Sequence, residues 1–178
     1  MVNTNISAII LAAGKGTRMK SNIPKVLHKI AGKTMLMHSI DLCRKNKIKN
    51  IVVVLGYDHD QVEKVIPDDV TIIKQDKQLG TAHALMQAKE FFLSKQGKLL
   101  ILYADVPLIR EETIKKLIRK ENRYNGLSVI GFISKKPKGY GRIILSNKNT
   151  VECIVEEVNA DKNQRAINLC NSGIIFGE

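Results

Sequence analysis

The sequence predicts one α/β domain built on a Rossmann-like, mostly parallel mixed sheet that is flanked by helices. Short apolar runs alternate with amphipathic segments along the first three quarters of the 178 residues, which indicates βαβ units with parallel strands and right-handed crossovers. Several of these runs are apolar throughout, as in strands of a sheet that is covered on both faces. A chain of this length is enough for a single domain with a buried core.

The first part of the chain, residues 1–122, is predicted to contain four strands and four helices. The predicted strands are residues 7–11, 50–55, 70–73 and 98–103. The helices are predicted from apolar side chains that recur on one face, and Thr34 and Asp58 are expected to cap the first two helices. The four apolar faces are Leu36, Ile40 and Cys43; Val62, Val65 and Ile66; Ala84, Leu85, Ala88, Phe91 and Phe92; and Ile114, Leu117 and Ile118.

The pattern changes in residues 123–178, where four further strands are predicted with little helix between them. These predicted strands are residues 127–134, 141–146, 151–157 and 170–176. They suggest a mixed extension of the sheet, or hairpins, that carry a second ligand surface. We therefore expect a single domain over residues 1–178, divided into a βαβ part and this β-rich part.

The net charge of +12 favours an anionic partner such as a nucleic acid, a phosphorylated ligand or a membrane surface. Nucleic acid is not expected, because the lysines are scattered and aromatic residues make up only 4% of the chain, which leaves little for base stacking. A membrane is not expected either, because no apolar run approaches the length of a membrane span.

The cysteines indicate a reducing compartment. Cys43, Cys153 and Cys170 are odd in number, widely separated and without a CxxC pair, which argues against a disulfide framework or a zinc site. The apolar run at residues 9–13 lacks the length and the preceding basic segment of a signal peptide. We therefore expect a cytoplasmic protein.

A glycine-rich turn follows the first predicted strand and reads Leu11-Ala12-Ala13-Gly14-Lys15-Gly16-Thr17-Arg18-Met19. Such a turn can cradle phosphates, because bare backbone N–H groups converge there and glycine permits close approach. A dinucleotide fingerprint does not fit, since Met19 stands where a third small residue is required. The P-loop pattern fails as well, because no Gly-Lys-Ser/Thr closes the turn. Taken alone, the turn could equally be a plain connection between strand and helix.

The dipeptide Pro24-Lys25 makes this pattern more specific. The combined pattern resembles the signature of the nucleotide-sugar pyrophosphorylases and reads Leu-Ala-Ala-Gly-x-Gly-Thr-Arg-Met-x4-Pro-Lys. These enzymes transfer a nucleotidyl group to a sugar phosphate. The resemblance implies that Arg18 and Lys25 are catalytic residues that neutralise developing charge, and that Lys25 also binds the nucleotide. It also implies that the loop wraps the base and phosphates at Leu11, Ala12, Ala13 and Gly14.

A second motif closes one predicted strand, opens the next helix and reads Gln75-x2-Gln78-Leu79-Gly80-Thr81-Ala82-His83. A glutamine amide can both donate to and accept from the Watson–Crick edge of a pyrimidine. A capped helix start with solvent-facing glutamines is the alternative. The motif is similar to the base-recognition loop of UDP-N-acetylglucosamine pyrophosphorylases, which implies that Gln75, Gly80 and Thr81 contact uracil. His83 has no visible carboxylate partner and is interpreted as a packing or surface residue.

Asp105 follows the apolar strand that ends at Tyr103. A carboxylate at the carboxyl end of a parallel strand lies where ligands bind in open α/β sheets, and it suits Mg²⁺. A capping role in the turn at Pro107 is the alternative. The resemblance implies that Asp105 is the metal ligand and that Tyr103, Ala104 and Asp105 border the sugar phosphate.

The β-rich part contains Gly141, Glu156 and Asn171 in three short polar segments. Taken alone, these segments could be two turns and a strand edge. Their order matches the acceptor-sugar segments of bacterial N-acetylglucosamine-1-phosphate uridyltransferases. The resemblance implies that the Gly141 backbone meets the acetamido sugar, that Glu156 binds sugar hydroxyls, and that Asn171 contacts the sugar or its phosphate.

From residue 6 onward the chain resembles the uridyltransferase half of bifunctional bacterial enzymes that also acetylate glucosamine-1-phosphate. The resemblance implies a nucleotide-diphospho-sugar transferase fold, with the nucleotide in the first part and the sugar phosphate in the second. The implied reaction joins UTP and N-acetylglucosamine-1-phosphate with Mg²⁺, giving UDP-N-acetylglucosamine for peptidoglycan and lipopolysaccharide synthesis. Another sugar- or cofactor-nucleotidyltransferase of the same superfamily and an inactive nucleotide-binding fragment are the alternatives.

In that family the uridyltransferase domain continues beyond the point that corresponds to Glu178, and the continuation supplies an Asn as a second metal ligand. The family forms trimers through an acetyltransferase domain that this sequence does not contain. From these differences we expect this chain to bind uridine nucleotide and to turn over poorly.

Overall fold

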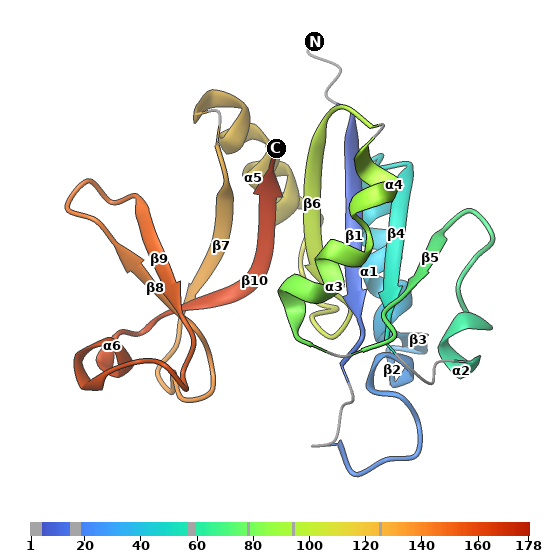
Figure 1. The fold of residues 1–178 in the computed structure, drawn as a ribbon, viewed down its shortest axis with the longest axis horizontal. Helices are drawn as coiled ribbons and strands as arrows, with labels where there is room; N and C mark the ends of the chain where they lie inside the picture. The colour runs from blue at the N-terminus through green and yellow to red at the C-terminus, as the bar shows by residue number, and fades with distance from the viewer. Residues whose placement is uncertain (1–4, 15–18, 57–59, 78, 94, 125) are drawn as a thin grey trace.

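The computed structural model describes residues 5–14, 19–56, 60–77, 79–93, 95–124 and 126–178. One eight-stranded sheet runs through them in the order β5-β4-β1-β6-β10-β8-β9, with β7 paired to β10, and helices cover it (Figure 1). The predicted Rossmann-like α/β fold is therefore confirmed. Its strands are β1 (Ile6–Ala12), β4 (Asn50–Leu55), β5 (Thr71–Lys74), β6 (Lys98–Tyr103), β7 (Ser128–Ile133), β8 (Arg142–Leu145), β9 (Val151–Val155) and β10 (Leu169–Gly177).

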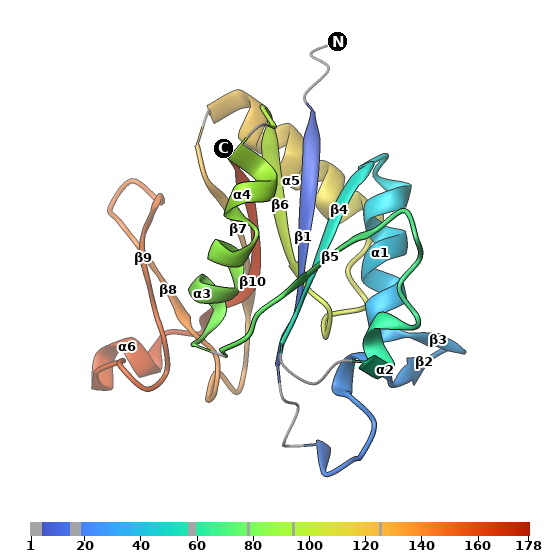
Figure 2. The same ribbon diagram turned by 45° about the vertical axis from the view of Figure 1, so that its right-hand side comes forward.

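The inner strands β1 and β4 of the parallel half of the sheet are buried on both faces, while the edge strand β5 is partly exposed. Strand β1 pairs in parallel with β4 and β6, and β4 pairs in parallel with β5. Helices α1 (Met35–Lys45) and α5 (Glu111–Tyr124) lie on one face, while α3 (Thr81–Gln87) and α4 (Lys89–Leu93) lie on the other (Figure 2). Alternate residues of β1 therefore enter different cores: Ile10 packs in the cluster of α1 and α5, and Ile9 packs in the cluster of α3.

The other half of the sheet is antiparallel. Strand β10 pairs antiparallel with β6, β7 and β8, and β8 pairs antiparallel with β9. Among the described residues the parallel pairs are thus confined to β1, β4, β5 and β6, so the sheet is more evenly mixed than the predicted, mostly parallel one. The predicted division after residue 122 falls inside α5, and β10 joins both parts into one sheet.

The short elements are the least predictable part of the fold. The single apolar stripe predicted from Ala84 to Phe92 forms two helices, because the helix tightens at its end, where the Ala88 N–H donates to the Leu85 carbonyl at 3.0 Å. The predicted cap Asp58 lies outside the described residues. Elements that the sequence analysis did not predict are the hairpin of β2 (Lys29–Ile30) and β3 (Lys33–Thr34), the 3₁₀ turn η2 (Lys25–Leu27) and α6 (Lys162–Ala166). Helix α2 spans Asp60–Glu63.

Helix α1 begins as the sequence predicts. Thr34 has extended backbone geometry, and its hydroxyl accepts a hydrogen bond from the Met37 N–H at 3.2 Å. This bond satisfies one of the N–H groups that have no partner within the helix.

Replacing Thr34 by Ala is expected to lower the free energy of unfolding by about 1 kcal/mol, because the first turn of α1 loses its cap. Thr34→Ser keeps the hydroxyl and serves as the control. Urea denaturation of the three proteins measures the difference. Equal stability of the Ala and Ser variants would show that the cap does not stabilise the fold.

A buried arginine ties the β-rich part together. Arg142 is only 1% exposed. Its guanidinium donates to the Ile167 carbonyl at 2.9 Å, to the Arg165 carbonyl at 3.3 Å and to the Tyr140 carbonyl. It also forms an ion pair with Glu157 at 2.7 Å. Because a buried charge is tolerated only when it is paired and hydrogen-bonded, these contacts fix the segments around Arg142 relative to one another.

The carboxylate of Glu157 makes this part of the fold sensitive to acid. The Arg142 hydrogen bond lowers the pKa of Glu157 below its ordinary value of 4.5; burial opposes this shift, and the Gly139 N–H adds to it. A carboxyl group with a lowered pKa in the folded state adds stability above its unfolded pKa and loses it as the pH falls through the folded pKa.

We therefore expect the difference in unfolding free energy between the wild type and Glu157→Gln to be largest above about pH 4.5 and to shrink as the pH falls further. Urea denaturation of both proteins across the acid range measures this difference directly. Other carboxyl groups titrate equally in both proteins and cancel. A difference that does not change with pH would contradict the ion pair.

Candidate functional site

Two residues predicted to act on phosphates and metal meet at the carboxyl ends of the parallel strands. The Lys25 Nζ lies 2.6 Å from Oδ2 of Asp105, across 80 residues of sequence. Both side chains are about one-third exposed, at 30% and 34%. The pair places a cation and a carboxylate together where ligands can reach them.

The strand ends position Asp105. The Ala104 N–H donates to the Leu11 carbonyl at 3.0 Å, which carries the pairing of β1 and β6 one residue past β6. The chain then turns, with the Val106 N–H 3.3 Å from the Tyr103 carbonyl. Among the described residues, the Asp105 carboxylate contacts Lys25 and not the turn at Pro107.

Tyr103 connects the predicted base side of the site with the predicted sugar side. Its hydroxyl donates to the Thr81 hydroxyl at 3.3 Å. Its ring packs against Gly173, where an added Cβ would lie 2.3 Å from a ring carbon and where φ is +79°. Only glycine fits this position, for both steric and backbone reasons. The end of β6 therefore contacts the start of α3 and the middle of β10.

Strand β10 is irregular where it passes Tyr103. Its register with β7 shifts between Asn171 and Ile175. The Ser172 hydroxyl donates to the Ile130 carbonyl at 2.6 Å and accepts from the Ile174 N–H at 3.2 Å, which satisfies backbone groups that the irregularity leaves unpaired. The side chain of Asn171 accepts from the Gly173 N–H at 2.9 Å. Irregularities of this kind are common next to active sites, and this one begins at Asn171.

The three residues predicted to bind the sugar lie together. The Asn171 N–H donates to the Gly141 carbonyl at 2.8 Å. An added Cβ at Gly141 would lie 3.0 Å from Oε1 of Glu156. Arg142 and Glu157, next to these residues in sequence, form the buried ion pair described above. The three predicted sugar-binding residues therefore lie close together, and the ion pair of Arg142 with Glu157 stabilises the segments that carry them.

On the predicted base side, Gln75 is only 2% exposed, so the solvent-facing alternative is wrong for this residue. Its N–H extends the β4–β5 pairing by donating to the Leu55 carbonyl at 2.7 Å. Its amide Nε2 donates to the Gly80 carbonyl at 3.3 Å and lies 2.8 Å from Nδ1 of His83. Gly80, with φ of +100°, is the N-cap of α3.

The structure shows less about the other residues that were predicted to contact the nucleotide. Leu11 and Ala12 are buried at the end of β1, so any contribution from them to ligand binding comes from the backbone. Ala13 and Gly14 follow them into the loop. Arg18 lies outside the described residues. Sequence reasoning missed the contact of His83 with Gln75 and the burial of Arg142, neither of which has a local signal in the sequence.

Within the described residues, no group of three or more His, Cys, Asp or Glu side chains could hold a metal ion. A metal at Asp105 would therefore share its coordination between that carboxylate and ligand oxygens, an arrangement that Mg²⁺ commonly accepts.

The buried thiol of Cys43 has a pKa raised to about 12 by burial, which keeps it protonated. No described helix is both long and apolar enough to cross a membrane.

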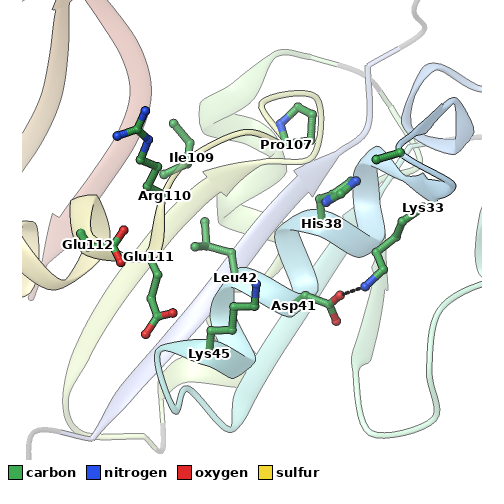
Figure 3. Close-up of a pocket in the computed structure, with 11 residues that line it drawn as sticks. Lys33, His38, Asp41, Leu42, Lys45, Pro107, Ile109, Arg110, Glu111 and Glu112 are labelled. Atoms are coloured by element: carbon green, nitrogen blue, oxygen red, sulfur yellow. Dashed lines mark hydrogen bonds and ion pairs between the residues drawn. The ribbon is translucent and has the colours of Figure 1, made fainter.

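A separate cavity of about 530 Å³ lies on the face of α1 (Figure 3). Its lining shares no described residue with the predicted site, although Pro107 lies two residues after Asp105. Two of its lining residues, Lys33 and Asp41, form an ion pair. The lining residues are Ala31, Lys33, His38, Asp41, Leu42, Lys45, Pro107, Ile109, Arg110, Glu111 and Glu112.

Comparison with proteins of known sequence identifies close relatives. The chain is 44% identical over 172 residues to the bifunctional protein GlmU of Clostridioides difficile, which covers 96% of this chain and 37% of the relative. It is 43% identical over 175 residues to the bifunctional protein GlmU of Neisseria meningitidis, which covers 98% and 38%. The chain thus spans less than two fifths of the length of these relatives. The likeness confirms the resemblance drawn from the loop signature.

Comparison of folds identifies a solved structure with the same architecture. A crystal structure from Bacillus anthracis, described as a glucose-1-phosphate thymidylyltransferase in complex with a sucrose, superposes with a TM-score of 0.82 over 97% of this chain and 71% of its own. At 20% sequence identity this match shows a common fold. The family model described as the MobA-like NTP transferase domain matches residues 8–166, and the chain therefore belongs to this family of nucleotidyltransferase domains.

Proposed function

We propose that this chain transfers the uridylyl group of UTP to N-acetylglucosamine-1-phosphate, giving UDP-N-acetylglucosamine and pyrophosphate. The observation that carries the proposal is the Lys25–Asp105 ion pair at the carboxyl ends of β1 and β6. It lies between a buried glutamine that suits a pyrimidine and a cluster of Gly141, Glu156 and Asn171 that suits a sugar. The likeness to GlmU proteins supports the same substrates. The product would serve cell-wall precursor synthesis in the cytoplasm.

The proposed reaction needs no protein nucleophile. An oxygen of the sugar phosphate attacks the α-phosphorus of UTP; the new P–O bond forms as the bond to the β-phosphate oxygen breaks, and pyrophosphate leaves. The protein therefore acts by positioning the two substrates and by neutralising charge. Mg²⁺ held by Asp105 and phosphate oxygens would supply part of that neutralisation.

The ion pair suggests how Lys25 and Asp105 divide this work. In the free protein the two side chains neutralise each other at 2.6 Å. A triphosphate offers Lys25 a stronger partner, and the Asp105 carboxylate then becomes available to a cation. Because both side chains are partly exposed, breaking the pair costs little.

Tyr103 marks the boundary between the two substrates in this proposal. Its hydroxyl bond to Thr81 holds it toward the nucleotide, and its ring against Gly173 supports the strand that carries Asn171. A ligand oxygen can replace Thr81 as the partner of the hydroxyl.

Calorimetric titration with nucleotides in the presence of Mg²⁺ tests the proposal. We expect UTP to bind more tightly than GTP, because a site built around a paired amide rejects bases that leave it unmatched. An assay of pyrophosphate release with N-acetylglucosamine-1-phosphate then tests transfer. Tighter binding of GTP would assign the chain to another branch of the family, and UTP binding without release would indicate a nucleotide-binding fragment.

The Lys25→Met variant is expected to lower turnover by about 100-fold or more, because a donor to developing charge is lost. The same variant is expected to bind Mn²⁺ more tightly in the absence of nucleotide, since Asp105 loses the cation that neutralises it. Asp105→Asn should weaken Mn²⁺ binding. Titration of free Mn²⁺ by electron paramagnetic resonance measures both effects.

A matched control for the Lys25 variant is Lys33→Met, which breaks an ion pair with Asp41 that is not part of the predicted site. It should change neither turnover nor Mn²⁺ affinity. Unchanged turnover in Lys25→Met, or weaker Mn²⁺ binding by it, would contradict the assigned roles.

A further inference from the structure

We infer that His83 is a specificity-determining positioning residue: it holds the Gln75 amide in the one orientation that accepts uracil and rejects cytosine. The inference rests on the proposed function, because it assumes that Gln75 faces the base. The observation behind it is the contact of 2.8 Å between Nε2 of Gln75 and Nδ1 of His83.

The backbone fixes the polarity of this contact. The Gly80 carbonyl lies 3.3 Å from the same amide nitrogen of Gln75. A carbonyl oxygen can only accept, so the amide group that faces it must be the NH₂ and cannot be the oxygen. The Gly80 carbonyl also accepts from the Ala84 N–H at 3.1 Å, which anchors it in the first turn of α3. The amino group of Gln75 therefore has a fixed direction.

The second hydrogen of that amino group then goes to His83. To accept it, Nδ1 must carry a lone pair, so the ring is the neutral tautomer with its proton on Nε2. The amino group of Gln87, one helical turn further along α3, faces the His83 carbonyl at 3.4 Å and lies 3.3 Å from that Nε2, so the Gln87 amide must turn its oxygen to the ring to accept the Nε2 proton. Because Gln75 is 2% exposed, its amide has little room to exchange partners with water.

With its amino group committed to Gly80 and His83, Gln75 has its Oε1 to offer to a base. An acceptor at this point pairs with the N3–H of uracil or thymine. It opposes the lone pair on N3 of cytosine. A glutamine without a fixed orientation could turn over and donate to cytosine instead. The discrimination between uracil and cytosine therefore depends on the two acceptors that hold the amide, the Gly80 carbonyl and the nearer Nδ1 of His83, and not on Gln75 alone.

Calorimetric titration of the wild type and three variants with UTP and with CTP, in the presence of Mg²⁺, tests this inference. In His83→Phe, which keeps the ring and removes the acceptor, the ratio of the CTP to the UTP dissociation constant should fall about tenfold, as expected for one hydrogen bond. His83→Asn restores an acceptor oxygen near the position of Nδ1 and should keep the ratio. Met86→Ala, an exposed position of the same helix, serves as the control.

Equal weakening of both nucleotides by His83→Phe, with the ratio unchanged, would show a purely structural role and overturn the inference. A wild type that does not prefer UTP to CTP would instead contradict the proposed function. If His83→Phe does not fold, the ¹⁵N chemical shifts of the His83 ring in the wild type decide the point. An unprotonated Nδ1 supports the inference, and a protonated Nδ1 overturns it.

Discussion

The pairing of β1 with β6 is the constraint on which the rest of the structure depends. Six consecutive residue pairs run in parallel register from Ile6 to Leu11, and the bond from the Ala104 N–H to the Leu11 carbonyl carries the ladder past the strand end. The loop after β1 and the turn after β6 must therefore leave the sheet side by side. This geometry brings Lys25 to Asp105 across 80 residues. Neither side chain could be placed by local structure alone.

The switch from parallel to antiparallel pairing gives the site its second half. Because β10 runs antiparallel to β6 and then bends at Asn171–Gly173, it brings the β-rich part to the same edge at which the parallel strands end. Tyr103 contacts Thr81 on one side and Gly173 on the other. Two substrates that must react with each other can therefore be held on opposite sides of one strand end. The buried Arg142 holds the segments around it in place through its contacts with Ile167, Arg165 and Glu157.

The parallel strands could be predicted from sequence because their apolar runs reflect burial on both faces, and Asp105 and Gln75 followed from their positions at strand ends. The balance of parallel and antiparallel pairs could not, since strand direction in the β-rich part depends on contacts distant in sequence. Arg142 belongs to a residue type that is almost always exposed, so its burial gave no local signal. The contact of His83 with Gln75 depends on the Gly80 turn, with φ of +100°, which composition does not reveal.

The central claim is that the Lys25–Asp105 edge of the sheet holds the triphosphate and its cation. A crystal structure of this chain with UTP and Mn²⁺ tests it most directly, because Mn²⁺ can stand in for Mg²⁺ and its anomalous signal locates the ion. The account predicts Mn²⁺ beside the Asp105 carboxylate, Lys25 moved from Asp105 onto a phosphate, and uracil against Gln75. An intact Lys25–Asp105 ion pair, with the nucleotide bound in the cavity beside α1 or elsewhere, would contradict it.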